Sequence, residues 1–217
     1  MEPVAGGSAR LHREVAGPFN ALVLAAAKEG FGLSVASGFR SFARQLALWN
    51  AKARGDRPVL DEQGGPVDLA SLTPPQQAAA ILRWSGLPGA SRHHWGTDVD
   101  VFDTRAVPAG AGPRLLPEEY EAGGLFFPLR LWLDGNAERY GFFRPYLTDR
   151  GGVAPEPWHL SAAPLAQTCL ASYDRVWLER LVSQTPDFAL RETVLGMLPA
   201  VELRFIRACD PEPFLAS

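Results

Sequence analysis

Three of the four histidines in the chain lie in two short polar segments that carry metal-ligating side chains. The first segment spans residues 91–100 and reads Ser-Arg-His-His-Trp-Gly-Thr-Asp-Val-Asp. A strand is expected from about Thr97, and because side chains alternate along a strand, Asp98 and Asp100 point to one face. His93 precedes this strand across Gly96, whose missing Cβ permits a tight turn. A histidine and an aspartate therefore meet where the strand begins, unless the segment is an ordinary polar loop with a capping histidine and a solvated aspartate.

The second segment is Glu156-Pro157-Trp158-His159. Pro157 disfavours the helical region for Glu156, so the segment differs from the helical H-E-x-x-H motif of thermolysin-type peptidases. In an extended chain Glu156 and His159 point to different faces. Near one metal ion, one of them would bind the metal while the other reaches its bound water. The alternative is that Trp158 anchors the core and its polar neighbours have no further role.

Taken together, the two segments predict a catalytic zinc site. Two histidines and one carboxylate complete a three-ligand site with an open position for water, and a separate glutamate supplies the general base. A structural zinc site made of cysteines is excluded, because the chain has only two cysteines and they are far apart. A Ser-His-Asp hydrolase using Ser91 is disfavoured, because the chain lacks the G-x-S-x-G turn.

A third polar segment, Ser37-Gly38-Phe39-Arg40-Ser41, joins an expected strand to an expected helix. Arg40 at this junction would bind a carboxylate through two parallel hydrogen bonds or stabilise an oxyanion. An isolated arginine near a helix start is more often a surface residue, so the assignment depends on the other two segments.

The elements that must position these residues are short strands bracketed by helices. Apolar spacing and capping residues predict helices over 11–30, 41–54, 73–84, 125–140 and 164–183, with further helix after 185. Strands or extended pieces are expected over 33–37, 97–102, 141–146 and 156–160, and loops over 56–71 and 106–117. No regular βαβ alternation appears, so the prediction is an α+β fold with a small, mainly antiparallel sheet. We expect one domain over 1–217, with a motif-bearing core at about 33–162 and C-terminal helices at 163–217 packed on it.

Composition excludes several classes of protein. The chain has 217 residues, of which 47% are hydrophobic and 21% charged, and a formal net charge of −3. These values are typical of a globular domain, and no basic stripe indicates a nucleic-acid partner. The longest apolar stretch, about 21–27, is far shorter than the roughly 20 residues of a membrane span. Cys169 and Cys209 are expected to be buried thiols rather than a disulfide.

Together and in this order, the three segments resemble the motifs of one known family. The motifs S-G-F-R-S with Gln45 four residues beyond Ser41, then S-x-H-x-x-G-x-x-x-D, then E-P-W-H, together resemble the VanY-type zinc D-alanyl-D-alanine carboxypeptidases. These belong with the LAS group of peptidoglycan peptidases, whose fold is shared with the zinc domain of Hedgehog proteins. The motifs span about 37–160, more than half of the chain.

The resemblance implies roles for individual residues. It implies that His93, Asp100 and His159 bind one Zn²⁺ and that Glu156 is the catalytic base. It also implies that Arg40 contacts the substrate or the developing oxyanion, with Ser91 lining the substrate site. Gln45 matches a motif position and is expected beside the substrate.

The activity implied by this resemblance is hydrolysis of a D-Ala-D-Ala bond in a peptidoglycan-derived peptide by a carboxypeptidase. A D-Ala-D-Ala dipeptidase and an L-Ala-D-Glu endopeptidase are alternatives within the family, and a non-catalytic zinc-containing module that binds peptidoglycan is an alternative of another class. The substrate class implies the periplasm or cell envelope, whereas the N-terminal residues show no signal-peptide pattern, which indicates the cytoplasm. The compartment and the oligomeric state therefore stay open.

Two residues of the second motif raise a question about the metal site. Asp98 stands where the family usually has a small residue, often alanine. Its carboxylate is expected either to perturb the metal site or to bind Arg92 or Arg105. His94, next to His93, is a competing ligand candidate, although the S-x-H spacing favours His93.

Overall fold

The computed structural model describes residues 1–61, 64–108 and 110–210. Its main sheet is antiparallel, with the strand order β3-β4-β6-β5. These strands are β3 (Leu33–Ser37), β4 (Asp98–Asp103), β5 (Phe142–Phe143) and β6 (His159–Ala162). A separate two-stranded sheet pairs β1 (Glu2–Pro3) with β2 (Arg10–Leu11). The central pair, β4 and β6, carries Asp98, Asp100 and His159.

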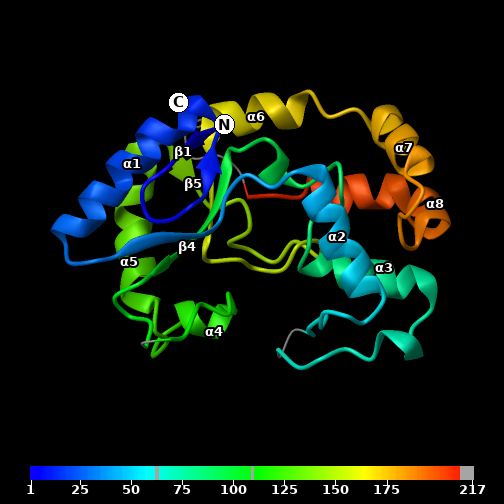
Figure 1. Cartoon of the computed structure of the whole chain (residues 1–217), viewed down its shortest axis with the longest axis horizontal. Helices are drawn as coiled ribbons and strands as arrows, with labels where there is room; N and C mark the ends of the chain where they lie inside the picture. The colour runs from blue at the N-terminus through cyan, green and yellow to red at the C-terminus, as the bar shows by residue number, and fades with distance from the viewer. Residues whose placement is uncertain (62–63, 109, 211–217) are drawn as a thin grey trace.

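One hydrophobic core lies between the sheet and two helices, α1 (Arg13–Lys28) and α5 (Phe127–Asn136), on the left in Figure 1. Helix α1 begins where the His12 side chain accepts a hydrogen bond from the backbone N–H of Glu14. Its residues Val15, Phe19 and Leu22 follow helical spacing and are buried against the sheet. On the sheet, Val99, Val101 and Leu160 are buried in this core, so their strand neighbours must face the other way.

A second hydrophobic core is built by α2 (Phe42–Ala53), α3 (Pro74–Arg83), α7 (Arg175–Gln184) and α8 (Arg191–Val201), on the right in Figure 1. Ser41 caps α2 by accepting a hydrogen bond from the N–H of Arg44. Trp49 of α2 is fully buried and its indole N–H donates to the carbonyl of Ala189 at 2.9 Å. This contact attaches α2, the helix that follows Arg40, to the C-terminal part of the chain.

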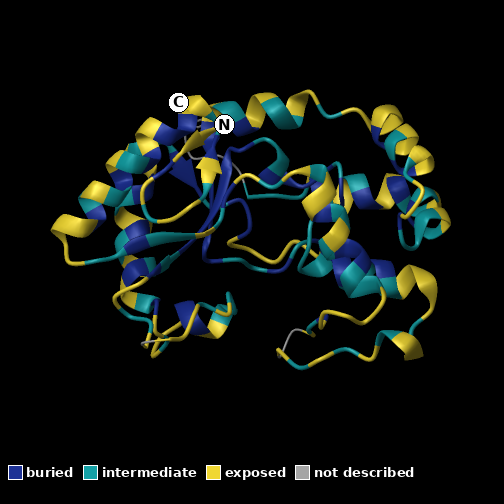
Figure 2. Cartoon of the chain, viewed as in Figure 1, coloured by how far each residue is buried: buried dark blue, intermediate teal, exposed yellow. Residues whose placement is uncertain are grey.

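Short helical segments complete the fold, and α6 (Ala163–Ala171) links the two halves across the top of Figure 1. The others are η1 (Leu69–Ser71), η2 (Arg92–His94), α4 (Pro117–Tyr120), η3 (Ala137–Tyr140) and η4 (Glu202–Ile206). Figure 2 shows that the strands of the main sheet are mostly buried, while the outward faces of the helices are exposed. Among the described helices, none combines the length and the apolar character needed to cross a membrane.

The fold confirms the predicted α+β class with small antiparallel sheets, and the strand predicted at 33–37 has those bounds. The helix predicted over 164–183 is wrong, because Asp174 caps a new helix, α7, by accepting hydrogen bonds from the N–H groups of Val176 and Trp177. The strand predicted at 141–146 is limited to Phe142–Phe143. The C-terminal helices expected at 163–217 are present up to Ile206, and residues 211–217 lie outside the described part. Cys169 and Cys209 form no disulfide, and both are partly rather than fully buried.

Candidate metal centre and its cleft

The strand register brings two predicted metal ligands together. Asp100 of β4 lies directly opposite His159 of β6, and Ser37 of β3 lies opposite Asp100 on the other side. Directly opposite residues of an antiparallel pair have their Cβ atoms roughly 5 Å apart, so their side chains meet. The core-facing residues Val99 and Leu160 fix which face of each strand carries the polar side chains.

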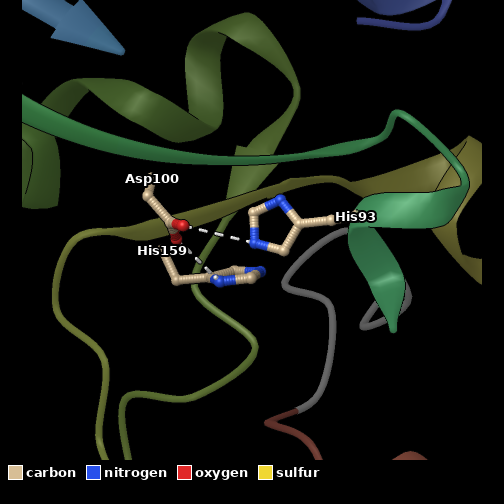
Figure 3. A group of neighbouring side chains, drawn as sticks. All are labelled: His93, Asp100 and His159. Carbon is tan, nitrogen blue, oxygen red and sulfur yellow. Dashed lines mark ion pairs between the residues drawn. The ribbon is translucent and has the colours of Figure 1, made fainter. Parts of the chain in front are cut away.

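His93 reaches the same point from η2, the turn that precedes β4. Its Nδ1–H donates a hydrogen bond to the carbonyl oxygen of Gly38 at 2.8 Å, since that oxygen can only accept. The lone pair is therefore on Nε2, which lies 3.3 Å from Oδ2 of Asp100 (Figure 3). The hydrogen bond to Gly38 thus selects the tautomer that exposes a ligand atom to the cluster.

His159 is oriented in the same manner through its other nitrogen. Its Nε2–H donates to Oδ1 of Asp98 at 2.9 Å, so the neutral imidazole that a metal requires has its lone pair on Nδ1. Burial lowers the pKa of His159, but hydrogen bonds to Asp100, Asp98 and Glu156 outweigh this effect and raise the pKa well above its usual value when no metal is bound. Nδ1 lies 3.1 Å from Oδ1 of Asp100, on the side where the imidazole of His93 also lies (Figure 3). The two histidines therefore direct one ring nitrogen each, Nε2 of His93 and Nδ1 of His159, toward the same carboxylate of Asp100.

The donor atoms of His93, Asp100 and His159 fit a zinc ion. One ligand atom from each residue lies within 4.8 Å of the others, and all three residues are buried. Among the described residues, Oδ1 of Asp100 and Nδ1 of His159 have no hydrogen-bond partner although both are buried. The two nitrogen–oxygen distances of 3.1 and 3.3 Å are close to the roughly 3.3 Å between neighbouring ligands about 2.0–2.1 Å from a tetrahedral zinc ion. Two imidazoles and one carboxylate are also a common catalytic zinc set.

Glu156 lies beside this cluster. The segment 156–159 is a turn, closed by a hydrogen bond from the N–H of His159 to the carbonyl of Glu156 at 3.0 Å. The expectation of an extended segment with Glu156 and His159 on different faces is therefore wrong, because Pro157 places a turn there. Oε2 of Glu156 lies 3.1 Å from Nδ1 of His159, while Glu156 is outside the group of three ligand residues.

Arg40 approaches the cluster from the end of β3. Its guanidinium donates to Oε1 of Gln45 and to Oγ of Ser37, both at 2.7 Å, and it lies 3.9 Å from Oδ2 of Asp100. Gln45 was expected beside the substrate, but it is fully buried and also donates to the carbonyl of Gly86 at 2.6 Å. Gln45 therefore fixes the position of Arg40 from behind instead of forming part of the cleft surface.

The cluster opens into a cleft of about 390 Å³. Its walls include the expected residues Arg40, Ser91, His93, Asp100, Glu156 and His159. They also include residues that sequence reasoning missed, which are Lys52, Arg57, Trp84 and Tyr146. Lys52 lies one helical turn beyond Leu48, which also lines the cleft. Tyr146 has no sequence signal, because tertiary packing alone brings its ring 5.1 Å from that of His159.

The two open questions about the second motif have structural answers. Asp98 binds Arg92, at 2.8 Å, and not Arg105, and it also holds His159. His94 is outside the ligand cluster. Its Nδ1–H donates to the carbonyl of Arg40 at 2.6 Å and its Nε2 accepts from the N–H of Gly89 at 3.0 Å. His94 therefore connects the two loops that carry Arg40 and His93.

Comparison with known families and sequences agrees with this arrangement. Residues 8–164 match the model of the VanY family, described as D-alanyl-D-alanine carboxypeptidase. A D-alanyl-D-alanine carboxypeptidase of Enterococcus faecalis is 30% identical over 138 residues, which make up 62% of this chain and 41% of that protein. An uncharacterized protein of Haemophilus influenzae is 45% identical over 83 residues, or 37% of this chain and 63% of the relative. The matched regions thus span less than two thirds of the length of these curated relatives.

Solved structures show the same fold. A vancomycin-resistance D,D-pentapeptidase VanY, crystallised as a mutant in complex with Zn(II), has a TM-score of 0.53 and 26% identity. The match covers 77% of this chain and 81% of that one. VanYB in complex with D-alanine-D-alanine has a TM-score of 0.56 and 22% identity, over 80% of this chain and 88% of that one.

Proposed function

Because the chain belongs to the VanY family of D-alanyl-D-alanine carboxypeptidases, we propose that it is a zinc-dependent carboxypeptidase that removes the terminal D-alanine from peptidoglycan-derived peptides ending in D-Ala-D-Ala. The observation that carries the proposal is the buried cluster of His93, Asp100 and His159 with Glu156 beside it, at the base of an open cleft. A purely structural zinc site needs neither a neighbouring carboxylate nor an arginine, so the combination supports catalysis over a binding module.

In this proposal His93, Asp100 and His159 hold the metal through Nε2, a carboxylate oxygen and Nδ1 respectively. Bound zinc would supply Lewis acidity, which polarises a carbonyl and lowers the pKa of a water molecule toward about 7. The carbonyl of Gly38 and the carboxylate of Asp98 keep the two imidazoles in the orientation that this role requires.

Glu156 acts as the general base. Its Oε2 lies at the edge of the cluster, within reach of a water molecule attacking from the cleft. The carboxylate takes the proton of that water as the C–O bond forms. It then delivers the proton to the nitrogen of the departing D-alanine as the C–N bond breaks, so Glu156 ends the cycle in its starting charge state.

Arg40 stabilises negative charge at the reacting carbonyl. The guanidinium is fixed by Gln45 and Ser37 before any substrate arrives, and it faces the same end of the cleft as Asp100. A donor that is already oriented stabilises a developing oxyanion without reorganising during the reaction. Ser91, which is almost fully buried, forms the adjacent cleft wall.

The experiment is a comparison of the wild-type chain with Glu156→Gln, both loaded with zinc, on a pentapeptide ending in D-Ala-D-Ala. We expect wild type to release free D-alanine in a chelator-sensitive manner. Glu156→Gln should bind the same amount of zinc, as measured by mass spectrometry, with kcat lower by about a thousandfold or more, since the base is lost.

Other products would assign other activities to the same site. Hydrolysis of the free dipeptide D-Ala-D-Ala with the pentapeptide left uncut would replace the carboxypeptidase with the dipeptidase. Cleavage of a longer peptide between L-Ala and D-Glu would replace it with the endopeptidase. Stoichiometric zinc with no hydrolysis of any of these peptides would favour a peptidoglycan-binding module. Full activity of Glu156→Gln would remove Glu156 from the role of base.

A further inference from the structure

One wall of the cleft carries two cations that the reaction described above does not use. Lys52 belongs to α2 and lies one helical turn beyond Leu48, which lines the same wall. Arg57 follows the end of α2 and lines the cleft as well. Lys52 and Arg57 therefore face the cavity that the metal cluster opens into.

These two cations differ from the other basic residues of the cleft in having no fixed anionic partner. Arg92 is paired with Asp98, and Arg114 is paired with Glu118. Among the residues that the structure describes, neither Lys52 nor Arg57 forms an ion pair within 4.0 Å. The hydrogen bond of Nζ of Lys52 is a long one, 3.5 Å, to the carbonyl oxygen of Trp84.

The surroundings of Lys52 raise the free energy of its protonated, unpaired ammonium group. Burial lowers its pKa to about 8; the charge of Glu156 opposes this shift, and the weaker effects of Arg57 and Arg40 add to it. A partly buried cation without a partner gains more from binding an anion than an exposed one does, because less water screens the pair. A carboxylate from a ligand in the cleft would supply that anion.

The geometry of α2 gives an approximate distance between Lys52 and the metal cluster. Gln45, which holds Arg40 at the metal cluster, and Lys52 lie seven residues apart on α2, or about 10 Å along its axis. An extended peptide covers that distance in about three residues. A carboxypeptidase leaves only one residue on the leaving side of the cleaved bond, so a peptide reaching Lys52 must do so with its acyl side.

We propose that Lys52 and Arg57 form a binding subsite for a carboxylate on the acyl side of the substrate, about three residues from the cleaved bond. The enzyme thereby selects acidic peptides over neutral ones of the same length. This inference rests on the proposed carboxypeptidase activity for its direction along the peptide, but the subsite itself is defined by the unpaired cations and the cleft.

The test uses two zinc-loaded assays on matched pentapeptides ending in D-Ala-D-Ala. The peptides differ only in the third residue before the cleaved bond, which is glutamate in one and glutamine in the other. We expect wild type to prefer the glutamate peptide by about tenfold or more in kcat/KM, as charge-assisted hydrogen bonds to a carboxylate allow. Lys52→Met should remove most of this preference by raising KM for the glutamate peptide alone, with kcat kept, because Lys52 is the more buried of the two cations.

A matched control is Arg54→Met, which removes a cation from the same helix end. Arg54 is exposed, pairs with Asp56 at 2.9 Å and does not line the cleft. It should therefore keep the wild-type preference. Arg57→Gln should reduce the preference partially, because Lys52 remains.

The failures of the two proposals are distinguishable. Equal cleavage of both peptides by wild type would overturn the subsite and leave the carboxypeptidase standing. If neither peptide is cleaved, the carboxypeptidase assignment fails, and calorimetric binding of the same two peptides decides on the subsite. Tenfold tighter binding of the glutamate peptide, lost in Lys52→Met and kept in Arg54→Met, would support it, and equal binding would overturn it.

Discussion

Asp98 and His159 are joined by a fully buried hydrogen bond, in which Nε2–H of the imidazole donates to Oδ1 of the carboxylate at 2.9 Å. The same oxygen accepts from Nε of Arg92 at 2.8 Å, and Thr97 donates to the second oxygen. Burial alone raises the pKa of Asp98, but the charge of Arg92 and the bonds from His159 and Thr97 hold it well below its usual value. An ionised carboxylate therefore lies directly behind a candidate zinc ligand.

Removing this carboxylate is expected to weaken zinc binding. Because Asp98→Ala alone would leave Arg92 charged, buried and unpaired, the informative variant is Asp98→Ala combined with Arg92→Leu. Loss of such a partner of a ligand histidine typically lowers metal affinity by about 10–100-fold. We expect that range in competition with a chromophoric chelator, on protein whose folding is checked by circular dichroism.

Ser161→Ala is the control for this change. Ser161 accepts a hydrogen bond from Arg92 at 2.6 Å, so the variant alters the same buried network without removing the carboxylate that accepts from His159. It should keep the zinc affinity of wild type. If the double variant keeps the zinc affinity of wild type, Asp98 stabilises the buried polar network and does not contribute to metal binding.

Gln45 is expected to act through Arg40. In Gln45→Met the guanidinium loses one of its two fixed acceptors, while the volume of the buried side chain is nearly kept. We predict that kcat falls about tenfold with zinc content unchanged, because a mobile donor stabilises the oxyanion less well. Gln77→Met is a matched control, since Gln77 donates to the carbonyls of Leu69 and Leu72 away from the cleft. An equal loss of kcat in both variants would point to general destabilisation.

Lys52 is expected to lower the stability of the folded chain at neutral pH. Its pKa falls from 10.5 to about 8 on folding, which corresponds to about 3 kcal/mol of unfavourable free energy for the protonated form. Between pH 8 and 10.5 the unfolded state binds more protons, so the stability of the folded state rises with pH there, and the cost is complete only below pH 8.

The variant Lys52→Met should therefore be more stable than wild type at pH 7, by at most about 3 kcal/mol. This advantage should shrink as the pH rises from 8 to 10.5. Urea unfolding of both proteins at pH 7 and near pH 10.5 measures it, with Arg54→Met as the reference for loss of a nearby surface charge. If Lys52→Met is more stable than wild type by the same amount at both pH values, the gain does not come from removing the buried ammonium group of Lys52.

Gly152 is expected to tolerate no side chain. A Cβ at this position would lie 1.6 Å from the carbonyl oxygen of Arg204, in the segment η4. Gly152→Ala must therefore push the 151–155 loop away from η4, at a cost of about 3 kcal/mol. For a chain of this size we expect Tm to fall by about 6–12 °C in a thermal melt. Gly112→Ala, where a Cβ meets nothing within 4 Å, should melt close to wild type.

Local patterns limited the candidate metal ligands to a few residues, and the family resemblance selected His93 over His94 and Asp100 over Asp98. Alternation along 97–102 placed Asp98 and Asp100 on one face, and both now lie against His159. The position of Gly96, with a φ of +72°, allowed His93 to turn back toward the strand. These features depend on a few neighbouring residues, so the sequence carried enough information about them.

Features that depend on distant segments were not predictable. The choice of Arg92 over Arg105 as partner of Asp98 requires knowledge of where Ser161 lies, because the guanidinium bridges the two. The role of Gln45 behind Arg40 depends on its hydrogen bond to Gly86, which is 41 positions away. The break before α7 had a local signal in Asp174, but the continuous apolar spacing of the segment favoured one long helix instead.

The two hydrophobic cores determine how much of the chain must be present for it to fold. The family match ends at residue 164, yet the second core is completed by Leu178, Val182, Val194 and Leu198, all beyond that point. Trp49 of α2 and Ile81 of α3 would be exposed to water in a chain that ended at residue 164. The segment shared with the family is therefore shorter than the segment that must fold, and a fragment designed on homology alone would expose an apolar flank and aggregate.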